Sequence, residues 1–115
     1  MSQRSDQVAE ELRKIISLIL LRELNDPRIG FLTVTRIEMT DDLRYAKVYY
    51  SVLGDERQKT ETEEALADNL KYIKRLAVQR INLKYAMDIR FELDPSIDHS
   101  FKIDNILNKI KKKEQ

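Results

Sequence analysis

Six basic residues lie between positions 71 and 90, and cationic side chains at regular spacing are groups that can bind phosphate. Lys71, Lys74 and Arg75 are three and four residues apart, so on a helix they share one face. Such a row of cations can follow a nucleic-acid backbone without reading its sequence. An ordinary solvated helix face has the same composition, and charge alone does not separate the two interpretations. The candidate nucleic-acid-binding residues are Arg28, Lys71, Lys74, Arg75, Arg80, Lys84 and Arg90.

The chain has few of the residues that enzyme active sites use. It contains no cysteine, one histidine and two glycines, which excludes thiol chemistry, His-pair metal sites and a glycine-rich phosphate loop. His99 lies in an Asp-His-Ser run, which allows a catalytic triad but is much better explained by the start of a helix. Asp41 and Asp42 are adjacent, which is typical of a turn rather than of a metal site. We therefore expect no enzyme, no metal and no cofactor.

Length and composition predict a single folded domain. The sequence has 115 residues, of which 42% are hydrophobic and 36% charged, and its formal net charge is +1. Roughly 100–200 residues per domain is usual, so the chain has room for one modest core. The lack of cysteine suits a reducing compartment. No apolar run reaches the roughly 20 residues of a membrane span, and the N-terminus is too polar for a signal peptide. We expect a cytoplasmic protein without membrane contact.

The first half of the chain predicts a helix followed by a β-hairpin. Apolar residues recur with helical spacing over residues 5–24, with Ser5 as the N-cap and Pro27 beyond the end. The stretch 18–21 is apolar all round, so we expect this helix to lie deep against a sheet. Residues 31–39 and 44–53 are rich in β-branched and aromatic side chains, and a Thr-Asp-Asp turn lies between them.

The second half predicts helix, strand and helix. A helix begins near Thr60 or Thr62, with Thr60 and Glu63 in the form of a capping box. Its acidic residues come first and its basic residues last, which complements the helix dipole. Residues 88–94 alternate between apolar and charged side chains, as a half-buried strand does. A terminal helix from residue 97 and a basic solvated tail over residues 111–115 follow.

These elements predict an α+β fold. The last two strands are separated by more than thirty residues that include a helix, which is the length of a crossover connection. We therefore expect a three-stranded mixed sheet with helices on one face. The other face is expected to be solvated, with Thr33, Thr35, Lys47, Tyr49, Ser51, Arg90 and Glu92 on it. The tyrosines Tyr45, Tyr49, Tyr50 and Tyr72 are able to stack on bases, although strand aromatics more often serve the core.

Three stretches of the sequence, taken in order, resemble a known family. They are ELRKIISLILLRELNDPRIG, FLTVTRIEMTDDLRYAKVYYSVLG and YIKRLAVQRINLKYAMDIRFELDPSIDHS. Within them, Asn25-Asp26-Pro27-Arg28, Thr33-Val34-Thr35, and Phe91 with Asp94 and Ser96 match family motifs. No single motif is specific, but the ordered set is similar to the ribosome-binding factor A family over nearly the whole chain.

The resemblance implies a type II KH-like domain over residues 1–115, in the order helix, strand, strand, helix, helix, strand, with a C-terminal helix. This order agrees with the one expected from the residues. The resemblance also implies a non-enzymatic assembly factor that binds the small (30S) ribosomal subunit and its 16S rRNA. It implies a role in late maturation of that rRNA and in cold adaptation. We expect the free protein to be a monomer.

Two departures from the family pattern affect the second helix and the last strand. An ordinary KH domain uses a Gly-x-x-Gly loop, which this chain cannot form. The family has an interrupted helix around Ala-x-Gly, and the corresponding residues here are Asn69-Leu70-Lys71, which leaves open whether the helix bends. The family often has a proline before the last strand, where this chain has Ala86-Met87-Asp88.

A second class of function remains open. The chain is also interpretable as a protein-interaction module that docks a partner through its exposed sheet face or through an acidic patch. That patch consists of Glu61, Glu63, Glu64 and Asp68.

Overall fold

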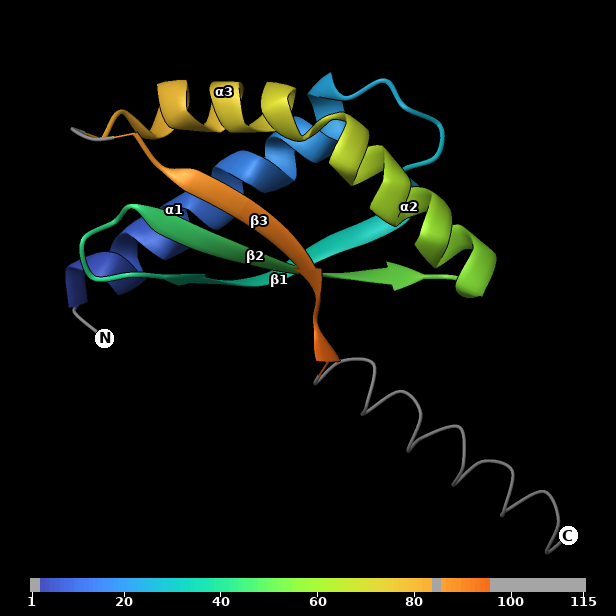
Figure 1. The fold of residues 1–115 in the computed structure, drawn as a ribbon, viewed down its shortest axis with the longest axis horizontal. Coiled ribbons are helices and arrows are strands. Elements are labelled where there is room, and N and C mark those ends of the chain that lie inside the picture. Colours follow the sequence, from blue (N-terminus) through green and yellow to red (C-terminus); the bar gives the residue numbers. More distant parts are fainter. Residues whose placement is uncertain (1–2, 84–85, 96–115) are drawn as a thin grey trace, which may run out of the picture.

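In a computed structural model, residues 3–83 and 86–95 are described. They form α1 (Gln3–Leu18), a π-helix η1 (Ile19–Glu23), β1 (Phe31–Met39), β2 (Tyr45–Leu53), α2 (Glu56–Asp68), α3 (Leu70–Ile81) and β3 (Asp88–Leu93). The sheet has the order β1-β2-β3, with β1 antiparallel and β3 parallel to β2. The helices lie on one side of it (Figure 1). Lys84, His99, the terminal helix and the basic tail lie outside the described residues.

A bulge in β1 explains why the apolar residues of this strand change from even to odd positions. The pairing with β2 shifts between Val34 and Arg36, so that Val34 lies opposite Tyr50 while Ile37 lies opposite Val48. One extra residue reverses the side to which the following side chains point. Apolar residues on both sides of the bulge therefore face the helices, on the same side of the sheet as Ala46, Val48, Tyr50 and Val52 of β2.

The helix starts differ from the sequence prediction. The capping box of α2 is formed by Asp55, whose side chain accepts from the Gln58 N–H, while the Gln58 side chain accepts from the Asp55 N–H. The prediction of a start at Thr60 or Thr62 was wrong, because Thr60 donates to the Glu56 carbonyl one turn back. Ser5 does not cap α1, since it lies inside the helix, buried, with its Oγ 3.5 Å from Asp41 Oδ1.

The end of the first helix is less deeply buried than expected. Its last turn, η1, is closed by a bond from the Leu24 N–H to the Ile19 carbonyl. Ile19 and Leu20 are buried, whereas Leu18 and Leu21 are 46% and 76% exposed. Four consecutive residues point to different sides of a helix, so only part of the apolar stretch 18–21 is able to face the core.

Fully buried side chains from α1, α3 and β2 form the centre of the core. Leu12 and Ile16 of α1, Ile73 and Ala77 of α3, and Val48 of β2 are all inaccessible to solvent. Close-packed protein interiors of this kind have low compressibility. The buried side of α3 is thus packed into the core, and its outer side faces solvent.

Candidate nucleic-acid interface

The outer side of α3 carries the three cations that helical spacing predicted to lie together. Lys71 and Arg75 are exposed and Lys74 is partly exposed, on the side opposite the buried Ile73 and Ala77. The helix contains four basic residues and no acidic one. Lys71 and Arg75 have no ion-pair partner among residues 3–83 and 86–95. Their charge is therefore available to a ligand.

A groove of about 350 Å³ runs between α3 and the chain segment that leads into β3. Its sides carry the three cations, and apolar atoms form most of the remaining surface. Its lining residues are Lys71, Lys74, Arg75, Val78, Gln79, Ala86 and Met87. Lys74 Nζ lies 3.1 Å from Asp88 Oδ1, and this bond lowers the pKa of the Asp88 carboxyl. A groove with cations beside an apolar surface suits a phosphate backbone with its sugars and bases.

One tyrosine adjoins these cations. Tyr72 is 39% exposed, and the Arg75 guanidinium lies 5.5 Å from the centre of its ring. The other three tyrosines belong to β2 and differ in their surroundings. Tyr50 is buried in the core, which raises its pKa to about 12, and Tyr49 lies beneath the Arg36 guanidinium, 3.8 Å away. Tyr45 is 60% exposed on the open face of the sheet.

The remaining predicted cations lie elsewhere. Arg80, near the end of α3, pairs with Glu23 of η1. Arg90 lies opposite Lys47 in the register of β2 and β3, on the sheet face away from the helices. Arg28 lies in the loop before β1 and pairs with Asp26 and Asp68. The structure therefore brings Lys71, Lys74 and Arg75 together, with Arg80 further along the same helix.

The long helix is interrupted at Asn69, within the segment Asn69-Leu70-Lys71 that the family pattern indicated. Asn69 has φ −100° and ψ 5°, between the helical and extended regions. Leu70 and Lys71 already belong to the first turn of α3. Figure 1 shows that α2 and α3 run in different directions. An asparagine thus forms the bend without glycine.

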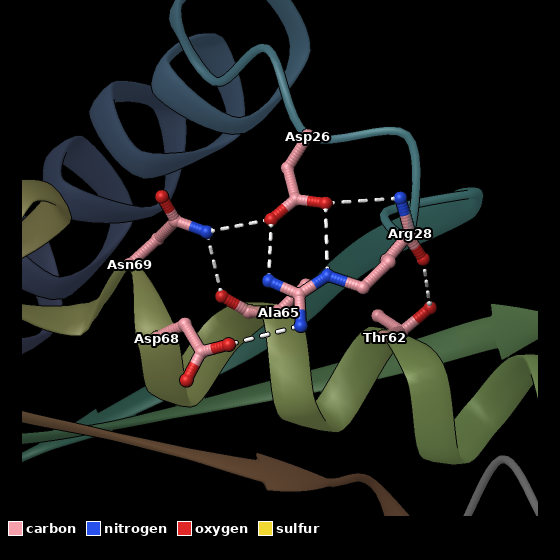
Figure 2. Close-up of polar contacts among 6 residues, drawn as sticks. All are labelled: Asp26, Arg28, Thr62, Ala65, Asp68 and Asn69. Carbon is pink, nitrogen blue, oxygen red and sulfur yellow. Dashed lines mark hydrogen bonds and ion pairs between the residues drawn. The ribbon is translucent and has the colours of Figure 1, made fainter.

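A polar network holds the bend (Figure 2). The Asn69 Nδ2 group donates to the Ala65 carbonyl at 2.8 Å and to Asp26 Oδ2 at 3.0 Å. Asp26 also accepts from the backbone N–H, Nε and Nη2 of Arg28. These bonds hold the pKa of the Asp26 carboxyl far below its usual range and raise that of Arg28.

Arg28 and Asn69 were predicted from the sequence as site residues, whereas Asp26, their common partner, was noted only as part of a family motif. The Asx-turn form of Asp26-Pro27-Arg28 is a local signal for the bond within the loop. Nothing local indicates the contact with Asn69, which is 43 residues away in the chain.

The described residues offer no metal site and no membrane-spanning helix. Asp42 accepts from Thr40 Oγ1 and from the Arg44 N–H within the turn between β1 and β2, as expected for turn residues. Residues 3–83 and 86–95 hold no cluster of three possible His, Cys, Asp or Glu ligands. Within the same ranges, no helix has the length and apolar character needed to cross a bilayer.

A sequence model of ribosome-binding factor A matches residues 4–107. The chain belongs to this family. It is 44% identical over 113 residues to ribosome-binding factor A of Halothermothrix orenii, covering 98% of this chain and 93% of that protein.

Solved structures of other proteins share the fold. A Thermotoga maritima protein in solution is 32% identical, with a TM-score of 0.68, and the match covers 80% of this chain and 88% of that one. A Thermus thermophilus ribosome-binding factor A homology model, fitted into a cryo-EM map of its 30S complex, is 18% identical. Its TM-score is 0.62, and the match covers 76% of this chain and 92% of that one. The α+β, KH-like fold predicted from the sequence is confirmed.

Proposed function

We propose that this protein binds the small (30S) ribosomal subunit by placing the outer side of α3 against 16S rRNA. The observation that supports this most directly is the set of free cations, Lys71 and Arg75, beside Lys74 on a groove with an apolar surface. Phosphate contacts of this kind give affinity for folded RNA without sequence readout. The Thermus thermophilus family member, described in a complex with 30S, supports the choice of partner.

In this proposal, the protein acts by binding one arrangement of the rRNA more tightly than another, without catalysing a reaction. A rigid core presents α3 in one orientation, so an rRNA arrangement that fits α3 binds more tightly than one that does not. A difference of about 1–3 kcal/mol shifts two populations roughly 5- to 150-fold. This is the action of a non-enzymatic assembly factor in late rRNA maturation. Escape from wrong RNA pairing is slower in the cold, which accounts for a role in cold adaptation.

The remaining expectations belong to the same proposal. The protein works in the cytoplasm as a monomer, without a cofactor. Arg80 contributes from the end of α3 that contacts η1. Lys84 follows α3 in the sequence and is proposed as a further phosphate contact. Arg90 contributes from the sheet face, and Arg28 through the loop that it holds against α2.

Co-sedimentation with purified small and large subunits tests the proposal. Lys71→Glu with Arg75→Glu is expected to weaken binding to the small subunit at least tenfold with little change in thermal unfolding, because both side chains are exposed. Lys14→Glu with Arg57→Glu is the matched control, since it changes the net charge equally on the exposed sides of α1 and α2. Unchanged binding by the α3 variant would refute the proposal.

The alternative of a protein-docking module gives a different result in the same assay. Helix α2 has five acidic residues and two basic ones, so a basic protein partner would dock there. Glu63→Gln with Glu64→Gln would then abolish association, whereas RNA binding through α3 predicts association as tight as that of the unaltered protein or tighter.

A further inference from the structure

The bend between α2 and α3 is made by a single residue that both helices share. The Asn69 N–H donates to the Ala65 carbonyl at the end of α2, and the Asn69 carbonyl accepts from the Ile73 N–H in α3. The backbone therefore keeps a hydrogen bond on each side of the bend, while its ψ of 5° departs from helical geometry. Alone, such a junction tolerates a range of angles.

The loop before β1 restricts that range, because it contacts α2 near its middle, at its end and at the bend (Figure 2). The buried Thr62 donates to the Arg28 carbonyl at 3.2 Å, and Arg28 Nη1 donates to Asp68 Oδ2 at 2.9 Å. Asn69 donates to Asp26 at 3.0 Å. The loop thus holds the final turns of α2 and the bend as one unit.

Asp26 is the centre of this unit. Each of its carboxylate oxygens accepts two hydrogen bonds, three in all from Arg28 and one from Asn69. Its side chain is only 16% exposed. A carboxylate whose acceptor positions are occupied in this way has a fixed orientation. An uncharged amide in its place has one oxygen fewer and presents donors toward the donors of Arg28 or Asn69.

The direction of α3 depends on the angle at Asn69, which these contacts with the loop before β1 hold in place. A small change in this angle moves residues farther along α3 by a larger distance. Lys71 lies two residues after Asn69 and Arg75 six residues after it, which is about 9 Å along a helix axis. A change of about 10° in the bend would move Arg75 by about 1.5 Å. A shift of this size is enough to break a phosphate contact that requires a heavy-atom distance near 3 Å.

We infer that Asp26 is a positioning residue for rRNA binding, which fixes the bend at Asn69 and thereby the placement of the α3 cations, without touching RNA itself. This inference rests on the proposed function of α3. It also explains how the chain keeps a defined bend with asparagine in place of glycine: the side chain of Asn69 is held by a carboxylate from a distant loop.

Asp26→Asn tests the inference, because charge and positioning predict opposite results. The substitution removes a negative charge, so electrostatics alone predicts tighter binding to the small subunit. Positioning predicts binding about tenfold weaker. Glu64→Gln is the matched control, since it makes the same charge change on an exposed part of α2 and is expected to bind as well as the unaltered protein or better.

Asn69→Ala provides a second variant that leaves the net charge unchanged. It removes the side-chain bonds to Asp26 and Ala65, and it is expected to weaken binding by a similar factor. In the double variant the two losses should not add, because both break the same contact. NMR amide shifts of the full chain should change over residues 69–81, along the whole of α3, and remain unchanged over residues 40–44, in the turn between β1 and β2.

The outcomes separate the inference from the proposed function. If the α3 charge reversal weakens binding while folded Asp26→Asn and Asn69→Ala proteins bind normally, the positioning role is wrong and the proposed function stands. If the charge reversal has no effect, the proposed function falls. If Asp26→Asn unfolds the chain, the folded Asn69→Ala protein decides, and normal binding by it overturns the inference.

Discussion

Lys71 and Lys74 face the same groove but differ in one respect that salt dependence can detect. Lys74 already holds the Asp88 carboxylate at 3.1 Å, whereas Lys71 has no such partner among the described residues. The salt dependence of binding comes from counterions that protein cations displace from the nucleic acid. A lysine that already pairs with a carboxylate in the free protein displaces fewer of these counterions when it contacts a phosphate. We predict that Lys71→Gln reduces the salt dependence of subunit binding more than Lys74→Gln does.

The expected magnitude follows from the number of cations. Each phosphate contact contributes about 0.9 to the slope of log K against log salt, so three contacts give about −2.7. Affinity then falls roughly 40-fold between about 50 and 200 mM salt, and roughly 12-fold after Lys71→Gln. Lys74→Gln should change the slope by less than about 0.9, because part of its charge is already neutralised. Asp88→Asn should restore the full contribution of Lys74.

Co-sedimentation of each variant with small subunits across a salt series measures these slopes. A thermal unfolding curve for each variant shows that the fold is retained. Equal changes of slope for Lys71→Gln and Lys74→Gln would refute the reasoning, since the Lys74–Asp88 pair would then not persist in solution. An unaltered slope after Lys71→Gln would show that Lys71 contacts no phosphate.

Two further predictions concern stability. Asp55→Ala should lower the free energy of unfolding by about 1 kcal/mol, because the cap of α2 is lost. Thr60→Ala should lower it by much less, because the Thr60 hydroxyl bonds to the Glu56 carbonyl of its own helix. Equal losses of the two variants in urea unfolding would place the cap elsewhere. The depressed pKa of Asp26 means that the unfolded chain takes up this proton at a higher pH than the folded chain does. Its contribution is present above about pH 5 and is lost as the pH falls. The melting temperature of Asp26→Asn should therefore fall less between about pH 6 and pH 3 than that of the unaltered protein, and parallel curves would contradict this.

The type and order of the elements were predictable because each has a local pattern. The apolar spacing in α1 and α3 and the β-branched runs in β1 and β2 persist over nine or more residues. The only sign of the β1 bulge in the sequence is that apolar residues stop alternating regularly with polar ones along this strand. The start of α2 was not predictable from spacing alone, because Asp55 with Gln58 and Thr60 with Glu63 both have the spacing of a capping box.

The site was predictable only where it depends on one helix. Lys71, Lys74 and Arg75 share a face by helical geometry alone, and the structure places them so. The distant partners of Arg28 and Arg80 were not predictable, because Asp68 and Glu23 are 40 and 57 residues away in the chain. Tertiary packing decides which cations are neutralised, and a linear charge pattern does not contain that information.

The opposite charges of α2 and α3 have a consequence for how the molecule meets a polyanion. With a net charge of +1, the protein experiences little overall attraction at long range. The acidic and basic helices are joined at Asn69, so the field of a polyanion exerts a torque that turns α3 forward and α2 away. An approach with α2 foremost is disfavoured, because the acidic side chains of this helix repel a polyanion. The orientation of the protein is thus set before contact, by the way charge is divided between two helices joined at a bend.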